Sequence, residues 1–175
     1  MNKIRPITYN QAEEPWGKRI YSNCNNPRQT MASSGSAPTL CADIIATLKN
    51  KNVDPWLMAQ LSMKWNCRTN NSGTRWNFFS MVAEYFGISK FIQSQRFEVL
   101  TDCIDAGGYV ICSMKEGYWF RFPNYICAWN YDNEYVYAID SHNNRKNKQR
   151  INDFREQSKM YFCFYPDRFS GGNDD

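Results

Sequence analysis

Apolar residues recur every three to four positions in the first half of the chain and at alternate positions in much of the second half. The clearest helical stripe begins at Ser36 and consists of Ala37, Leu40, Cys41, Ile44, Ile45 and Leu48. Ser36 is a favourable N-cap residue, and Pro38 falls in the first turn, where its missing N–H costs nothing. The pattern therefore predicts a central helix from Ser36 whose apolar stripe is buried.

Three more helices are predicted before the pattern changes. One begins at Asp54-Pro55, a cap followed by a proline, and runs to Trp65. The next covers 74–86 and stops at Gly87, and the last covers 94–106 and stops at Gly107-Gly108.

After Gly108 the spacing of apolar residues changes from the helical period to the period of two that is typical of strands. Short β-rich runs at 109–114, 125–131, 134–140 and 160–165 predict four strands. Asp132-Asn133 predicts a tight hairpin between the middle two. Helices first and antiparallel strands second predict an α+β fold, with the Ser36 helix packed against the sheet.

The chain of 175 residues fits one domain over 1–175, because no stretch is long enough to act as a linker. Residues 1–35 have little periodicity, and we assign 1–19 as an extended lead-in. The Ser-Gly-Gly-rich tail at 170–175 is predicted to be disordered.

The composition is that of a globular domain with a sizeable core, because 42% of residues are hydrophobic and 22% are charged. Neither an apolar run of membrane-spanning length nor the apolar region of a signal peptide is present, which predicts a cytoplasmic protein with no membrane partner. The seven cysteines form no CxxC pair, so we expect reduced thiols, no metal and no cofactor.

The net charge of +4 is too small to argue for a nucleic-acid partner. Basic residues concentrate in one place, at Arg145, Lys146, Lys148 and Arg150. Such a run is more often a solvated loop than a site.

Five segments resemble, in order, the double-glycine type of papain-like cysteine peptidases. They are Gln29-Thr-Met-Ala-Ser-Ser-Gly-Ser-Ala-Pro-Thr39, Gly73-Thr-Arg-Trp-Asn-Phe-Phe79, Gly107-Gly-Tyr-Val-Ile-Cys-Ser-Met114, Pro123-Asn-Tyr-Ile126 and Ala138-Ile-Asp140. In that family the first segment carries Ser-Gly-Cys-Gly-Pro-Thr after a glutamine, the fourth carries Gly-His-Tyr-Ile, and the fifth ends on an aspartate. The resemblance runs from about residue 20 to 165 and implies a papain-like fold.

The resemblance assigns a role to four positions. Ser36 stands at the nucleophilic cysteine, Asn124 at the general-base histidine, Asp140 at the acid that orients the histidine, and Gln29 at the oxyanion glutamine. A thiolate in such a site is favoured by the helix dipole and by the imidazolium beside it. An alcohol beside an amide has neither the acidity nor the base, so we expect a catalytically inactive homologue.

The segment before Asn124 corresponds to one wall of the family's substrate groove. Trp119 and Arg121, with Trp76 from the third segment, are therefore candidate ligand contacts beside Ser36, Asn124 and Asp140. The alternative is that two of the four rings at 76, 119, 120 and 122 belong to the core. Arg121 and the basic stretch at 143–150 favour an anionic ligand.

The favoured hypothesis is a binding protein that holds a small anionic molecule, a peptide or a protein in the former substrate cleft. By resemblance to relatives from phages and their hosts, it is an inhibitor of host defence in the host cytosol. One alternative is an active hydrolase in which Ser36 works with His142, the only histidine. Another is a structural interaction subunit, and oligomer formation stays open.

Overall fold

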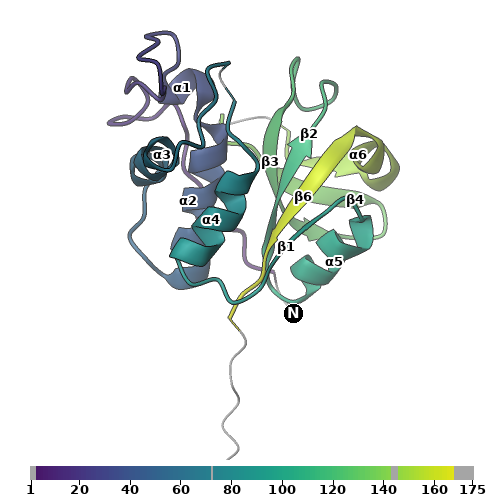
Figure 1. Ribbon diagram of the computed structural model, residues 1–175. Coiled ribbons are helices and arrows are strands. Elements are labelled where there is room, and N and C mark those ends of the chain that lie inside the picture. The colour runs from purple at the N-terminus through teal and green to yellow at the C-terminus, as the bar shows by residue number, and fades with distance from the viewer. Residues whose placement is uncertain (1–2, 72, 143–145, 168–175) are drawn as a thin grey trace, which may run out of the picture.

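A six-stranded antiparallel sheet separates two groups of helices (Figure 1). The strands follow the order β1-β6-β2-β3-β4-β5, and each neighbouring pair is antiparallel. The computed structural model describes residues 3–71, 73–142 and 146–167, so the predicted disordered tail at 170–175 lies outside the described residues.

The elements confirm the predicted α+β fold and add four that the pattern did not predict. The strands are β1 (Phe91–Ser94), β2 (Tyr109–Met114), β3 (Asn124–Tyr131), β4 (Tyr135–Ile139), β5 (Lys148–Arg150) and β6 (Ser158–Phe164). The helices are α1 (Met31–Ser34), α2 (Ser36–Lys49), α3 (Pro55–Lys64), α4 (Asn77–Tyr85), α5 (Phe97–Asp105) and α6 (Ile151–Gln157). The additions are α1, β1, β5 and α6.

Helix α2 is the central helix that the apolar stripe predicted. Its first eleven residues, from Ser36 to Ala46, are all buried, because α2 lies between the sheet and α3. The prediction that Ser36 caps the helix is wrong, since Gly35 occupies the N-cap position and Ser36 is already helical. Short helix α1 ends at Gly35, whose N–H donates to the carbonyl of Met31. The Ser36 hydroxyl is therefore not used as a cap.

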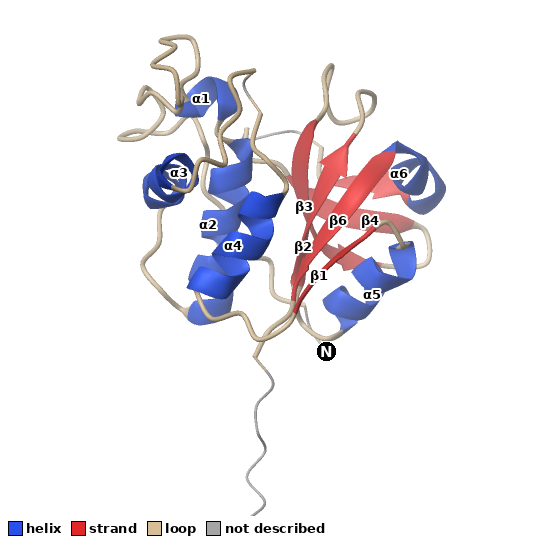
Figure 2. Ribbon diagram, in the orientation of Figure 1, coloured by secondary structure: helices blue, strands red, loops and turns tan. Residues whose placement is uncertain are grey.

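Both faces of the sheet are covered, with α2, α3 and α4 on one side and α5 and α6 on the other (Figure 2). Strand β2 shows the consequence. Its Ile111 packs in the core under α2, α3 and α4, whereas Val110 and Cys112 pack in the core under α5 and α6. All residues of β2 are therefore buried, and the strand is mainly apolar, with Ser113 as its one hydroxyl side chain besides Tyr109.

The β3–β4 hairpin brings two of the predicted site positions to the same end of the sheet. Asp132 accepts the backbone N–H groups of Glu134 and Tyr135 through its carboxylate, which confirms the predicted hairpin. The resulting register pairs Cys127 with Ile139. Asp140 therefore leaves β4 at the end of the hairpin where β3 begins.

Helix α3 begins as its sequence predicted, with the Asp54 carboxylate accepting the N–H of Leu57 and Pro55 in the first turn. Within the described ranges, no helix combines the length and apolar character needed to cross a membrane.

Candidate functional site

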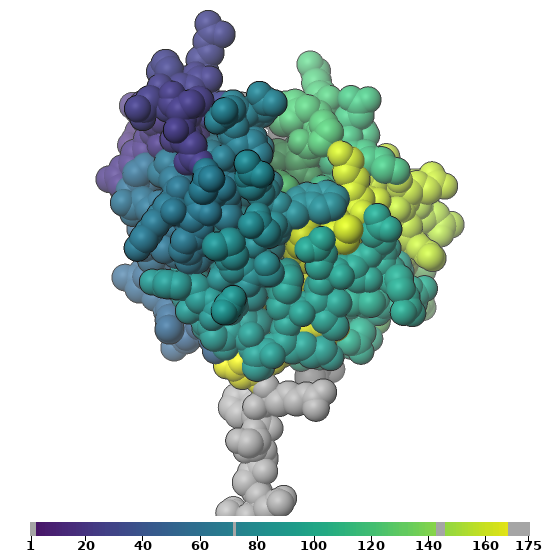
Figure 3. Space-filling view, viewed as in Figure 1, coloured from purple at the N-terminus to yellow at the C-terminus, as the bar shows by residue number. Residues whose placement is uncertain are grey.

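A cleft of about 400 Å³ opens between the N-terminus of α2 and the first residues of β3. Figure 3 shows the upper end of the molecule, where the N-terminal part of the chain and the β2–β3 loop stand apart. The lining consists mainly of hydroxyl, amide and aromatic side chains: Gln11, Ser33, Ser34, Ser36, Asn71, Gly73, Thr74, Trp76, Ser113, Phe122, Pro123, Asn124, Tyr125 and Lys159. Among these described residues there is one ammonium group and no carboxylate.

Ser36 and Asn124 meet at the floor of the cleft. The Ser36 hydroxyl donates to Oδ1 of Asn124 over 2.5 Å, and the same oxygen accepts the N–H of Tyr125 over 2.9 Å. Only 6% of Ser36 is exposed. The positions that the resemblance assigns to nucleophile and base are thus in direct contact, but the proton of the serine points to an amide oxygen.

Asp140 and His142 lie together just beyond β4. The Asp140 carboxylate is 6% exposed and accepts the backbone N–H of His142 over 2.7 Å. The His142 ring packs edge-on against Phe120, with 6.3 Å between ring centroids. Partial burial lowers the pKa of His142, although the charge of Asp140 opposes this shift. Since the Ser36 hydroxyl already donates to Asn124, His142 is not its hydrogen-bond partner.

Gln11 is a cleft residue that the sequence did not reveal. Its side chain is fully buried, and its amide nitrogen donates to the carbonyls of Met31 and Ala32 at 3.1 and 2.8 Å. Its Oε1 accepts the hydroxyl of Ser141 at 2.5 Å. Gln11 therefore joins helix α1, next to Ser36, to the turn that follows β4. No motif marks it, because it stands in the irregular lead-in.

Gln29, the predicted oxyanion glutamine, does not line the cleft. Its amide nitrogen donates to the carbonyl of Asn70 over 2.9 Å, and its buried Oε1 has no partner in the described part of the chain. The reason lies in α1. Thr30 caps that short helix, so Gln29 precedes it and is turned toward the loop at Asn70.

A buried arginine fixes the opposite wall of the cleft. Arg68 is 1% exposed, and its guanidinium stacks on the Tyr21 ring. Its Nε donates to the carbonyl of Tyr21 and its Nη1 donates to the carbonyl of Gly73, both over 2.8 Å. Burial lowers the pKa of Arg68. Within the described residues it has no carboxylate partner, and carbonyl groups hold the guanidinium instead. The loop that carries Asn71, Thr74 and the other wall residues is thereby anchored.

Trp76, Trp119 and Arg121, the candidate ligand contacts outside the catalytic positions, differ in where they lie. Trp76 lines the cleft, with 37% of the residue exposed. Trp119 is buried in the core against α5 and α6, where its Nε1 donates to Gln149 over 2.7 Å, so it is not brought to the cleft. Arg121 is exposed but does not line the cleft, and Phe122, which is 59% exposed, does.

The cysteines do not supply an alternative nucleophile. Cys24 is exposed and does not line the cleft, and the other six are buried. Burial raises the pKa of the Cys41 thiol, which lies on the apolar stripe of α2. Across the described residues, no group of three or more histidine, cysteine or acidic side chains is placed to hold a metal ion.

Two solved structures share this architecture. The peptidase domain of Streptococcus ComA, a bifunctional ABC transporter involved in a quorum-sensing pathway, matches with a TM-score of 0.60 and 18% identity, over 77% of this chain and 93% of that one. A C39-like peptidase from Bacillus anthracis matches with a TM-score of 0.53 and 12% identity, over 77% and 90%. No family model matches the sequence, and no curated protein sequence matches it. The likeness confirms the predicted papain-like fold of the cysteine-peptidase type.

Proposed function

We propose that this chain is a catalytically inactive homologue of papain-like peptidases that binds a small anionic ligand in the cleft at Ser36. The hydrogen bond from Ser36 to Asn124 carries this proposal. A serine becomes a nucleophile only when a neighbouring base accepts its proton as the new bond forms. The amide of Asn124 accepts a hydrogen bond but does not take up a proton at neutral pH.

The lining of the cleft supports an anionic ligand over a cationic one. Lys159 contributes the only ammonium group among the described lining residues, and no carboxylate opposes it. The hydroxyl groups of Ser33, Ser34 and Thr74 line the same space, and those of Ser33 and Thr74 already bond to the Arg28 carbonyl and the Tyr21 hydroxyl. Trp76 and Phe122 supply aromatic surface for the body of the ligand. The volume of about 400 Å³ falls in the range of small-molecule sites.

A labelling experiment tests the absence of catalysis. A fluorophosphonate reacts with a serine that is activated by a base, so we expect no labelling of the wild-type chain at Ser36. The matched control is Ser36→Ala, which should give the same background. Stoichiometric labelling that disappears in Ser36→Ala would show an active hydrolase, the alternative in which His142 serves as base.

Native mass spectrometry of protein purified from cells tests the binding role. We expect a retained mass on the wild-type chain that is lost in Trp76→Ala and in Asn124→Ala. Trp119→Phe is the matched control, because Trp119 lies in the core and not at the cleft. Arg121→Ala measures whether the exposed rim adds to the affinity. If the retained mass is lost in Trp119→Phe but not in the cleft variants, the molecule does not bind in the cleft and the proposed binding role of the cleft is wrong.

The broader assignments rest on the sequence. A phage-encoded inhibitor of host defence is what the resemblance implies, and it stays a prediction. The cytoplasmic location, which came from the lack of an apolar segment, and the alternative of a structural subunit stay predictions as well. The identity of the retained molecule in the preceding experiment bears directly on the first of them.

A further inference from the structure

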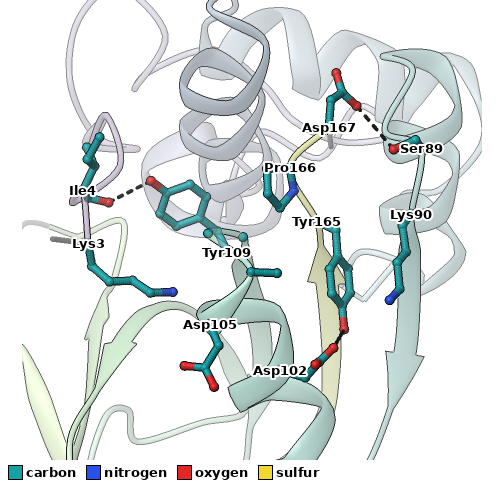
Figure 4. Close-up of a pocket in the computed structure, with 13 residues that line it drawn as sticks. Lys3, Ile4, Ser89, Lys90, Asp102, Asp105, Tyr109, Tyr165, Pro166 and Asp167 are labelled. Atoms are coloured by element: carbon teal, nitrogen blue, oxygen red, sulfur yellow. Dashed lines mark hydrogen bonds between the residues drawn. The ribbon is translucent and has the colours of Figure 1, made fainter. Parts of the chain in front are cut away.

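A second and larger cavity, of about 1160 Å³, lies where α5 ends, β2 begins and β6 ends. It shares no lining residue with the cleft at Ser36, which is lined by the first residues of β3 and the start of α2. In Figure 4 the Lys3 side chain reaches from the N-terminal segment toward the space between Tyr109 and Asp105, with Tyr165 across from it. The two cavities are therefore separate sites on the chain.

The carboxylates at this cavity already have donors. Asp102 accepts the hydroxyl of Tyr165 over 2.7 Å, and Asp105 accepts the hydroxyl of Tyr131 over 2.8 Å at both oxygens. Asp167 pairs with Lys49, with 2.7 Å between nitrogen and oxygen. The acidic groups of the lining therefore have partners from the protein itself.

The ammonium groups at the cavity do not have such partners. Nζ of Lys3 is buried and makes no hydrogen bond within the described residues. Burial lowers the pKa of Lys3, and the nearby Asp105 offsets this only in part. Lys90 forms no ion pair in the described part of the chain, and its Nζ lies 4.2 Å from the centroid of the Tyr165 ring. Among the described lining residues, Lys3 and Lys90 are therefore the charged groups that have no hydrogen-bonded or ion-paired partner, although the carboxylate of Asp105 lies near Lys3.

The walls between these charges are apolar and flat. Tyr109 is held in place by the hydrogen bond from its hydroxyl to the carbonyl of Ile4, over 2.7 Å. Tyr165 is held by Asp102, and Pro166 continues the same wall. Gly107 has a φ of +90°, a backbone conformation that favours glycine, and it lies beside the Pro166 ring in the same wall. Rigid rings around an unpaired ammonium suit a molecule with an aromatic body and one anionic head.

We propose that this cavity binds an amphipathic organic anion, with its anionic group at Lys3 and its aromatic body between Tyr109 and Tyr165. The anion restores to the buried ammonium the electrostatic interaction that it lost with water. The rings remove the aromatic body from water. This site is additional to the one proposed at Ser36 and does not depend on it.

The test uses two fluorescent probes that share an aromatic body, the anionic 8-anilinonaphthalene-1-sulfonate and the neutral N-phenyl-1-naphthylamine. We expect one equivalent of the sulfonate to bind at this cavity, apart from any that binds in the cleft at Ser36. Lys3→Met keeps the aliphatic stem and should weaken the sulfonate about tenfold or more, as the loss of a charge-assisted hydrogen bond does. The neutral probe should change less than twofold. Lys64→Met, at an exposed lysine in the last turn of α3 that lines neither the cavity nor the cleft, is the charge-matched control and should change neither probe.

A second variant removes the space without removing the charge. Ala106→Phe at the exposed end of α5 places a ring in the cavity and should weaken both probes at least tenfold. Trp76→Ala in the cleft should leave the equivalent that depends on Lys3 unchanged. Sulfonate affinity within twofold of wild type in folded Lys3→Met overturns the proposal, as does equal loss of both probes in that variant. Loss of that equivalent in Trp76→Ala assigns it to the cleft and also overturns the proposal. If Lys3→Met does not fold by circular dichroism, unchanged binding in Ala106→Phe gives the same refutation.

Discussion

Two substitutions should give a reactive thiol, because the side chains of Ser36 and Asn124 are already in contact at the N-terminus of α2. Ser36 is the first residue of a 14-residue helix whose N-cap, Gly35, offers no side chain and whose first turn contains no acidic residue. The dipole of α2 is therefore free to stabilise a thiolate. Asn124 already contacts Ser36 at 2.5 Å. Ser36→Cys combined with Asn124→His places a thiol against an imidazole.

The size of the effect follows from the ionisation of the thiol. A free cysteine has a pKa of about 8.5, and a helix N-terminus with an adjacent imidazolium lowers it to about 7 or below. At pH 6 a drop of about 1.5 units increases the thiolate fraction about thirtyfold. The less basic thiolate is intrinsically about fivefold less nucleophilic, so the rate of alkylation at pH 6 should be about sixfold above that of a free cysteine. The part of this rise that is due to the imidazole is the difference from Ser36→Cys alone.

The assay is the rate of alkylation by iodoacetamide from pH 5 to 9, followed by mass spectrometry. Cys24→Ser is the background, because Cys24 is exposed and the six other cysteines are buried. Ser36→Cys alone is the comparison. If both chains give the same pH profile, the imidazole does not meet the thiol. The interpretation of Ser36 and Asn124 as the replaced catalytic pair would then be wrong.

Three further predictions concern stability. Asp43 is fully buried and its pKa is raised by burial, so the folded state holds a proton that the unfolded state releases. The free energy of unfolding should therefore fall by up to about 1.4 kcal/mol per pH unit as the pH rises above about 4. Asp43→Asn should abolish this slope, and urea unfolding between pH 4 and 8 measures it. Arg68→Lys should lower the free energy of unfolding by about 1–3 kcal/mol, because a single ammonium cannot reach both carbonyls that the guanidinium satisfies, and thermal or urea unfolding measures this. In a double-mutant cycle, Ser36→Ala and Asn124→Ala should show a coupling of about 0.5–1.5 kcal/mol in unfolding free energy, and a coupling near zero would contradict their hydrogen bond.

Local patterns predicted the elements whose partners lie nearby or whose apolar face is long. Helix α2 carries a stripe over four turns, and the β3–β4 hairpin has its turn signal at Asp132. Strand β1 has neither, since it is four residues long and pairs Phe91 with Phe164 from the far end of the chain. The predicted helix at 94–106 began too early for a related reason. Ser94 looks like an N-cap, but its hydroxyl accepts the N–H of Arg96 in the turn that follows β1.

The local sequence pattern also does not predict which aromatic residues line the cleft. The aromatic run from Tyr118 to Phe122 does not say which ring turns inward. Gln149, thirty residues later, decides it by accepting the indole N–H of Trp119 in the core. Phe122 is left on the cleft side, 59% exposed. A choice made by a partner so far along the chain is not contained in any local pattern.

The cleft is supported by buried polar groups, and this affects how strongly its shape argues for a function. Gln11 and Arg68 anchor its two sides through hydrogen bonds to backbone carbonyls, and an unsatisfied buried group of this kind costs about 1–3 kcal/mol. Stability alone is therefore enough to keep these anchors, with or without a ligand. The exposed rings are different, because the parts of Trp76 and Phe122 that remain in water contribute little to folding, although Trp76 also packs edge-on against Phe162. Large apolar side chains grouped on the rim of a polar cleft are typical of a binding surface. For this reason the cleft variants that discriminate between a relic and a working site are those of the exposed rings, and not those of the anchors that hold the walls.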